Sequence, residues 1–267
     1  MKRSVATMAL VLPFLIPLAW AVLASFTPER SLFGGSALIP DAIVLSHYRA
    51  LFEQRDFWTP IRNSLVVSTL TTAVTLALGA PCAYALARLP VRGRDVVLAV
   101  VLAVSMFPQI AMVPALYLIL RAVGLLNSYP GLVLPYLTFA MPLAIWLLTG
   151  FFRQLPRDLE DAAMLDGASR VRTLRDIVLP LAWPGVATSG ILVFLYSWNE
   201  FLFALSFTLG PERYTVPVSI TLFRGQYQVP WGEVLAAATV ATAVVAIVVL
   251  VAQRRIVAGL TAGAVKG

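Results

Sequence analysis

Charged side chains are scarce in this sequence. They make up 12% of the residues, against 60% hydrophobic ones, and the mean hydropathy is +0.86. A soluble globular chain carries about 25% charged residues. A chain of 267 residues with so little polar surface cannot coat itself for water, so lipid must be the solvent for much of it.

Residues that carry out chemistry are also few. Cys82 and His47 are each the only one of their kind, which excludes an intrachain disulfide and a Cys/His metal site. The only lysines are Lys2 and Lys266, and no G-x-x-x-x-G-K-[ST], G-x-S-x-G or H-E-x-x-H occurs. We therefore expect no enzyme activity and no cofactor in this chain.

The net charge of +7 and the pI near 10 could suggest a nucleic-acid partner. Such proteins gather basic residues into a patch with interleaved aromatic residues. Here the charges lie between apolar segments instead, as membrane topology requires. The basic excess therefore predicts orientation in a membrane, with no nucleic-acid partner.

Six segments are long and apolar enough to span a membrane, which takes about 20 residues. They lie at about 8–27, 64–87, 97–120, 127–150, 183–207 and 233–252. Met1-Lys2-Arg3 imitates a signal peptide, but the apolar run to Phe26 is long for one, so we interpret it as a retained first helix. The sequence predicts an all-α, polytopic membrane protein with residues 1–267 as one domain.

Lysine and arginine set the orientation. With the N-terminus in the cytoplasm, 13 of these residues lie in inside segments and 7 in outside segments. This bias predicts that both termini are cytoplasmic. Prolines inside the apolar segments, such as Pro81, Pro108 and Pro142, fit either a bundle with a polar interior or ordinary kinked packing.

One charged loop, 151–182, is predicted to lie in the cytoplasm. Asp158 can begin a short helix in which Leu159, Ala162 and Ala163 share a face at i, i+3, i+4 spacing. The small alanines would let another backbone approach closely.

A turn at Asp166-Gly167 follows, because glycine accepts a positive φ. A second helix with Arg170, Arg172 and Arg175 should stop at Leu179-Pro180. The alternative is an amphipathic hairpin lying on anionic lipid. That alternative leaves Glu160, Asp161 and the paired alanines unexplained.

This loop resembles the EAA loop of ABC-importer permeases, in which E-A-A-x-x-x-G is followed, after nine residues, by I-x-L-P. The matching residues are Asp161, Ala162, Ala163, Gly167, Ile177, Leu179 and Pro180. Asp161 stands where the family usually has Glu, and Glu160 precedes it. The resemblance implies that the hairpin fits a cleft in a cytoplasmic ATPase through Glu160, Asp161, Ala162, Ala163, Asp166 and Gly167.

Further segments resemble the second permease of carbohydrate importers of the maltose and trehalose type. They are Asn63-Ser64, Ala83-Tyr84-Ala85 with Arg88, Ser197-Trp198-Asn199-Glu200-Phe201, and the tail 259–267 with Lys266. In the family this tail reaches between the two ATPases.

The resemblance implies a permease that forms half of the pathway for a disaccharide such as trehalose or maltose. It also implies a second permease, two ATPase subunits that bind ATP and Mg, and an extracytoplasmic sugar-binding protein. The location would be a bacterial or archaeal cytoplasmic (inner) membrane. A polyol, glycerol phosphate or an oligosaccharide is an alternative solute.

Glu200 is the exceptional ionisable residue within a predicted span, about 25 Å from Trp183 at 1.5 Å per residue. Two interpretations stay open for Trp198, Asn199 and Glu200: they line a sugar path, or they cap and tie neighbouring helices.

Two interpretations also stay open for the outer-loop residues Gln226, Tyr227 and Gln228: they recognise sugar hydroxyls, or they belong to a solvated loop. An ion-coupled carrier would need more ionisable residues in its spans.

Overall fold

The computed structural model describes residues 2–32, 42–223 and 229–262, with side chains from 12 to 251 within those ranges. All regular elements of the described chain are helices, which confirms the predicted all-α class. They are α1 (Lys2–Ser25), α2 (Glu29–Leu32), α3 (Ser46–Glu53), α4 (Trp58–Arg88), α5 (Arg94–Ser105), α6 (Gln109–Ala122), α7 (Tyr129–Gln154), α8 (Asp158–Leu165), α9 (Arg170–Thr173), the π-helical segment η1 (Leu174–Val178), α10 (Leu179–Leu181), α11 (Trp183–Asn199), α12 (Leu202–Phe207), α13 (Val216–Thr221) and α14 (Trp231–Ala262).

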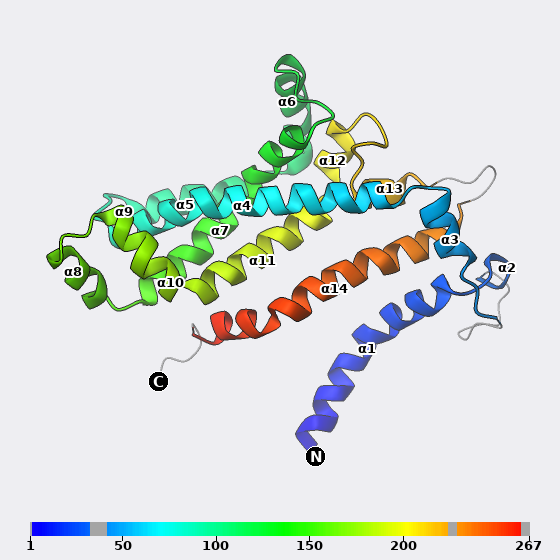
Figure 1. Cartoon of the computed structure of the whole chain (residues 1–267), viewed down its shortest axis with the longest axis horizontal. Coiled ribbons are helices and arrows are strands. Elements are labelled where there is room, and N and C mark those ends of the chain that lie inside the picture. The colour runs from blue at the N-terminus through cyan, green and yellow to red at the C-terminus, as the bar shows by residue number, and fades with distance from the viewer. Residues whose placement is uncertain (1, 33–41, 224–228, 263–267) are drawn as a thin grey trace.

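The centre of the molecule is a bundle of α4, α7 and α11. α14 packs on α11, α1 packs on α14, and α5 packs on α7. Figure 1 shows these long helices running lengthwise, with α8, α9 and α10 at one end. We call this the hairpin end, and the end with α2, α3, α12 and α13 the distal end.

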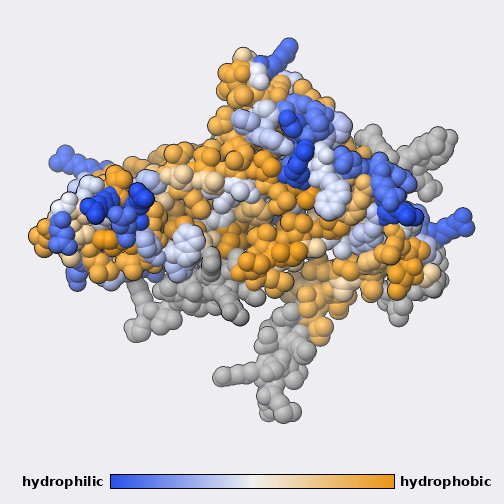
Figure 2. Space-filling model, viewed as in Figure 1, coloured by the Kyte–Doolittle hydropathy of each residue, from blue (hydrophilic) through white to orange (hydrophobic). Residues whose placement is uncertain are grey.

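The sides of the bundle are apolar, and polar residues gather toward its ends (Figure 2). α4, α7 and α14 are each long and apolar enough to cross a membrane. Two bent pairs, α5 with α6 and Arg170–Leu181 with α11, raise the number of candidate spans to five. Large apolar side chains such as Phe14, Val96 and Val251 are exposed on the surface of the chain, as expected for helices that lie in a membrane.

The expected continuous helix at 97–120 is wrong. α5 ends at Ser105, α6 begins at Gln109, and the two are bent by 87°. Pro108 has no N–H to continue the helix, and it disfavours the helical conformation for Phe107. The sequence therefore stays apolar across the break while the backbone turns.

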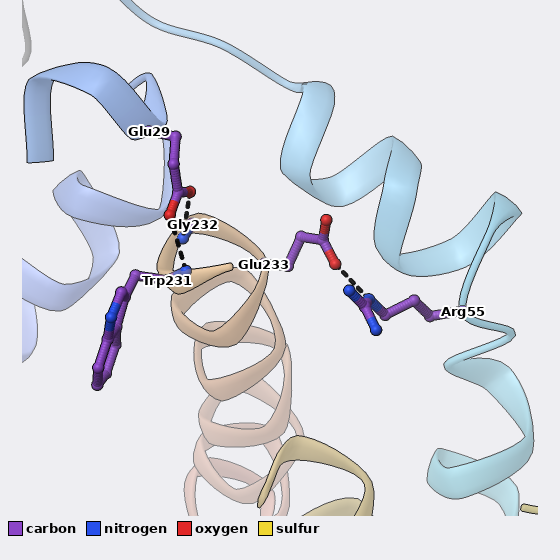
Figure 3. Close-up of polar contacts among 5 residues, drawn as sticks. All are labelled: Glu29, Arg55, Trp231, Gly232 and Glu233. Atoms are coloured by element: carbon purple, nitrogen blue, oxygen red, sulfur yellow. Dashed lines mark hydrogen bonds and ion pairs between the residues drawn. The ribbon is translucent and has the colours of Figure 1, made fainter. Parts of the chain in front are cut away.

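The distal end is held together by polar contacts around the start of α14 (Figure 3). The Glu29 carboxylate accepts hydrogen bonds from the backbone N–H groups of Trp231 and Gly232, both at 2.9 Å. Arg55 forms an ion pair with Glu233. Acceptors at a helix N-terminus satisfy N–H groups that have no partner within the helix. These contacts attach α2 and the turn after α3 to α14.

The first prediction concerns two glycines in α7. A Cβ at Gly131 would lie 2.0 Å from the Leu125 carbonyl oxygen, whereas one at Gly150 would meet nothing within 4 Å. Gly131→Ala should destabilise the protein by about 1–3 kcal/mol through overpacking. Gly150→Ala, the matched control, should leave stability unchanged or raise it by up to about 1 kcal/mol. Thermal unfolding in detergent measures both, and equal Tm values would contradict the close approach of the Leu125 backbone to Gly131.

Candidate functional site

The candidate site is the helix–turn–helix at the hairpin end. α8 is followed by Gly167 with a φ of +82°, and the Ser169 hydroxyl then accepts a hydrogen bond from Arg172 N at 3.3 Å at the start of α9. Asp158, Glu160 and Asp161 lie in the first turn of α8, where negative charge complements the helix dipole. Local capping and a glycine turn therefore shape this segment.

The two faces of α8 differ. Glu160 and Ala163 are buried against the bundle, whereas Leu159, Asp161 and Ala162 are exposed. Ala162 and Ala163 were expected to share a face, and the structure separates them. Neighbouring residues point about 100° apart on an α-helix, and burial of Glu160 turns Ala163 inward with it.

Glu160 is bound within its own chain. Its Oε1 lies 2.8 Å from Arg88 Nε, and its Oε2 accepts a hydrogen bond from the Tyr84 hydroxyl at 2.9 Å. The two charged side chains are only 4% and 7% exposed. Of the two acids expected to contact an ATPase, Glu160 faces the bundle and Asp161 faces outward.

The segment after the hairpin packs into the bundle. Leu174 and Val178 join a buried apolar cluster with Phe152 and Ala87. The expected stop at Leu179-Pro180 falls one residue early, because the chain stays helical through η1 and α10 to Leu181 and then bends by 82° before α11. Pro180 lies in α10, directly after the π-helical segment η1.

The residues of the expected sugar path lie in different surroundings. Trp198 is buried and stacks on Phe194 with ring centroids 6.0 Å apart. Asn199 is exposed, and its side chain donates to Leu195 O at 2.8 Å in its own helix. The structure thus leaves Asn199 as the exposed member of Trp198, Asn199 and Glu200.

Glu200 is buried and caps α12. Its carboxylate accepts hydrogen bonds from Phe203 N at 2.8 Å and Ala204 N at 3.0 Å. The expected continuous helix at 183–207 is therefore wrong, since α11 ends at Asn199 and α12 begins at Leu202, with Glu200 in the break between them. This contact corresponds to the capping alternative for Glu200.

Four residues named from the sequence, Gln226, Tyr227, Gln228 and Lys266, lie outside the described residues. Within the described part of the chain, no group of three or more His, Cys, Asp or Glu side chains could hold a metal ion.

Sequence reasoning missed the role of Asn63-Ser64. The buried Asn63 amide donates to the carbonyl oxygens of Glu212 and Tyr214, both at 3.0 Å, and accepts from the Tyr129 hydroxyl at 2.8 Å. Ser64 Oγ accepts from Val216 N at 2.8 Å. An uncharged polar pair at the start of an apolar run was the available signal.

Asn127 ties the loop at 208–216, which holds Glu212 and Tyr214, to the start of α7. Its Nδ2 donates to Glu212 Oε1 at 2.5 Å, and its Oδ1 accepts from Leu209 N at 3.0 Å. The Asn127 hydrogen bond lowers the pKa of Glu212 from its ordinary value of 4.5. The stabilisation from this contact is therefore present above pH 4.5 and is lost as the pH falls through the lower folded value.

The fold defines the class of protein: a multi-pass α-helical membrane protein with an exposed hairpin at one end. Residues 75–261 match the family of binding-protein-dependent transport system inner membrane components. The chain belongs to this family of ABC-transporter permeases.

Curated relatives cover nearly the whole chain. The trehalose transport system permease protein SugB of Mycobacterium tuberculosis is 44% identical over 95% of this chain and 93% of its own length. The trehalose/maltose transport system permease protein MalG of Thermococcus litoralis is 40% identical over 95% and 92%. The sulfoquinovosyl glycerol transport system permease protein SmoH of Agrobacterium fabrum is 40% identical over 99% and 93%.

A solved bacterial ABC transporter for the import of alginate shares the fold. Its matching chain has a TM-score of 0.80 at 24% identity, over 95% of this chain and 94% of its own length. This likeness supports the arrangement of the helices.

The second prediction tests the role of Glu200. Glu200→Ala should lower the free energy of unfolding by about 1–2 kcal/mol, because two N–H groups at the start of α12 lose their acceptor. Asn199→Ala should change it by less than about 0.5 kcal/mol, since that side chain is exposed. Chemical or thermal unfolding in detergent measures both. An unchanged Tm for Glu200→Ala would show that the cap contributes nothing.

Proposed function

We propose that the chain is the permease subunit of an ATP-driven sugar importer, which forms half of the translocation pathway and couples to a separate ATPase through α8 and α9. The observation that carries this proposal is the exposed face of α8. Leu165 is 90% exposed although apolar, and Leu159 is 44% exposed, beside Asp161. Apolar and acidic side chains together favour a protein surface over anionic lipid.

The docking residues of this proposal are Asp161, Ala162, Asp166 and Gly167 on the hairpin, with Lys266 of the tail. Glu160 and Ala163 take part by fixing the orientation of α8. ATP hydrolysis, with its Mg, takes place in the two ATPase partners. The hairpin corresponds to the EAA loop, 151–182.

The proposed topology has six spans within one domain, 1–267. Five come from α4, α7, α14 and the two bent pairs. α1, with 24 residues, is about 36 Å long and would supply the sixth across a hydrocarbon core of about 30 Å. With the hairpin in the cytoplasm, both termini are cytoplasmic.

The proposed solute is a disaccharide such as trehalose or maltose, in keeping with the names of two relatives. Asn199 and the segment Gln226–Gln228 are the proposed contacts along its path. The other proposed partners are a second permease and an extracytoplasmic sugar-binding protein. A related alginate transporter structure contains a periplasmic protein, which supports the last of these.

The test is reconstitution of the whole importer in proteoliposomes. ATPase activity should rise with the loaded binding protein, and the sugar that stimulates it identifies the solute among trehalose, maltose, polyols, glycerol phosphate and oligosaccharides. Uptake by the purified chain without ATPase subunits would instead establish an ion-coupled carrier.

The third prediction concerns Gly167. Gly167→Val places a β-branched residue at a φ of +82°, where such residues are strained. The hairpin should lose its shape, and sugar uptake should fall by about tenfold or more while the chain stays in the membrane.

Gly93→Val is the matched control. Gly93 also has a positive φ (+71°), has nothing within 4 Å of an added Cβ, and lies outside the hairpin. Uptake should survive there better than in Gly167→Val. Equal uptake by the two variants, with equal amounts in the membrane, would count against docking by this hairpin.

A further inference from the structure

α4 has polar contacts at both of its ends, one with the hairpin and one with the distal loop. We propose that α4 carries the movement of α8 to the loop at 208–216, and that Arg88 and Asn63 are the positioning residues at its two ends. This inference rests on the proposed coupling function and adds the route through the membrane.

At the hairpin end, one guanidinium holds the whole connection between α7 and α8. Arg88 Nη2 donates to Leu155 O at 2.6 Å, while Arg88 Nε pairs with Glu160 on α8. Both ends of the 155–160 segment are therefore fixed to the last residue of α4. A displacement of α8 must move α4 or break this contact.

Burial makes the Arg88–Glu160 contact costly to break. Removing one partner of a buried ion pair leaves an uncompensated charge. The other interhelical ion pair described at this end, Arg153–Asp95, has side chains that are 39% and 76% exposed, and solvent makes such a pair weak. The buried pair is thus the stronger link between hairpin and bundle.

At the distal end, Asn63 and Ser64 attach α4 to the loop. Three hydrogen bonds reach the backbone at Glu212, Tyr214 and Val216. Asn63 is fully buried, so its amide cannot exchange these partners for water. The loop therefore follows the end of α4.

Between these ends, α4 is one continuous helix of 31 residues. It is about 46 Å long at 1.5 Å per residue, and Pro81 inside it removes one backbone hydrogen bond without ending the helix. Along its length it packs against α7 and α11, the two long helices on either side of the hairpin in sequence. A single helix thus runs from the hairpin end of the bundle to the distal end.

The experiment uses the complete importer, reconstituted with ATPases and binding protein, in a Cys82→Ser background. Arg88→Cys and Glu160→Cys replace the ion pair and are joined by a short bifunctional thiosulfonate that a reductant cleaves. The readout is sugar transported per ATP hydrolysed, with whichever of trehalose and maltose stimulates the parent complex.

The cross-linked complex should transport at nearly the parent ratio, and cleavage should lower the ratio by about tenfold or more, since a mechanical link is then lost. The same preparation is measured before and after cleavage, so a folding defect cannot produce the difference. Equal ratios in the two states would overturn the role of the Arg88–Glu160 contact.

A second variant tests the distal end. Asn63→Asp keeps the size and the acceptor for Tyr129 but loses the amide donor to Glu212 O and Tyr214 O. It should lower the amount of sugar transported per ATP hydrolysed, while ATPase co-purification and basal ATPase activity stay unchanged. Arg153→Ala, the control, should leave all three quantities unchanged. If Asn63→Asp transports as much sugar per ATP hydrolysed as the parent complex, α4 is not the route of coupling. Failure of the parent chain to bind ATPases would instead reject the proposed function.

Discussion

The buried ion pair between Arg88 and Glu160 is the constraint on which the hairpin depends. Charges removed from water must be paired, since an isolated buried charge costs far more than a paired one. The contacts of Glu160 with Arg88 and Tyr84 turn one face of α8 toward the bundle. Ala163 then faces the bundle and Leu165 faces outward. The surface proposed to meet the ATPase follows from a contact that the ATPase does not touch.

The same physical rule explains the polar residues at the starts of three helices. Backbone N–H groups have no water partner in a membrane, so a helix that starts there needs an acceptor from the protein. Glu200 supplies one for α12, and Ser128 accepts from Gly131 N at the start of α7. At the distal end, Glu29 does the same for α14. These polar residues within or beside apolar runs therefore act as capping groups for the helices that follow them.

Much of the fold could be predicted from hydropathy, because the long apolar runs at α4, α7 and α14 are signals that a single sequence contains. The turn at Gly167 could also be predicted from glycine's tolerance of positive φ. The break before Gln109 and the inward orientation of Glu160 could not be predicted from the sequence. A hydropathy window averages across Phe107-Pro108, and the partner of Glu160 lies 72 residues away along the chain at Arg88. Long-range pairing decides which of two adjacent acids, Glu160 or Asp161, remains exposed.

The most direct test of the central claim is photo-cross-linking from single positions in the assembled importer. A photoreactive residue at Leu165, on the exposed face of α8, should capture an ATPase subunit. The same probe at Val96, an exposed apolar residue of α5, should capture lipid. Capture of lipid alone from Leu165, in a complex that still hydrolyses ATP, would contradict docking through this face.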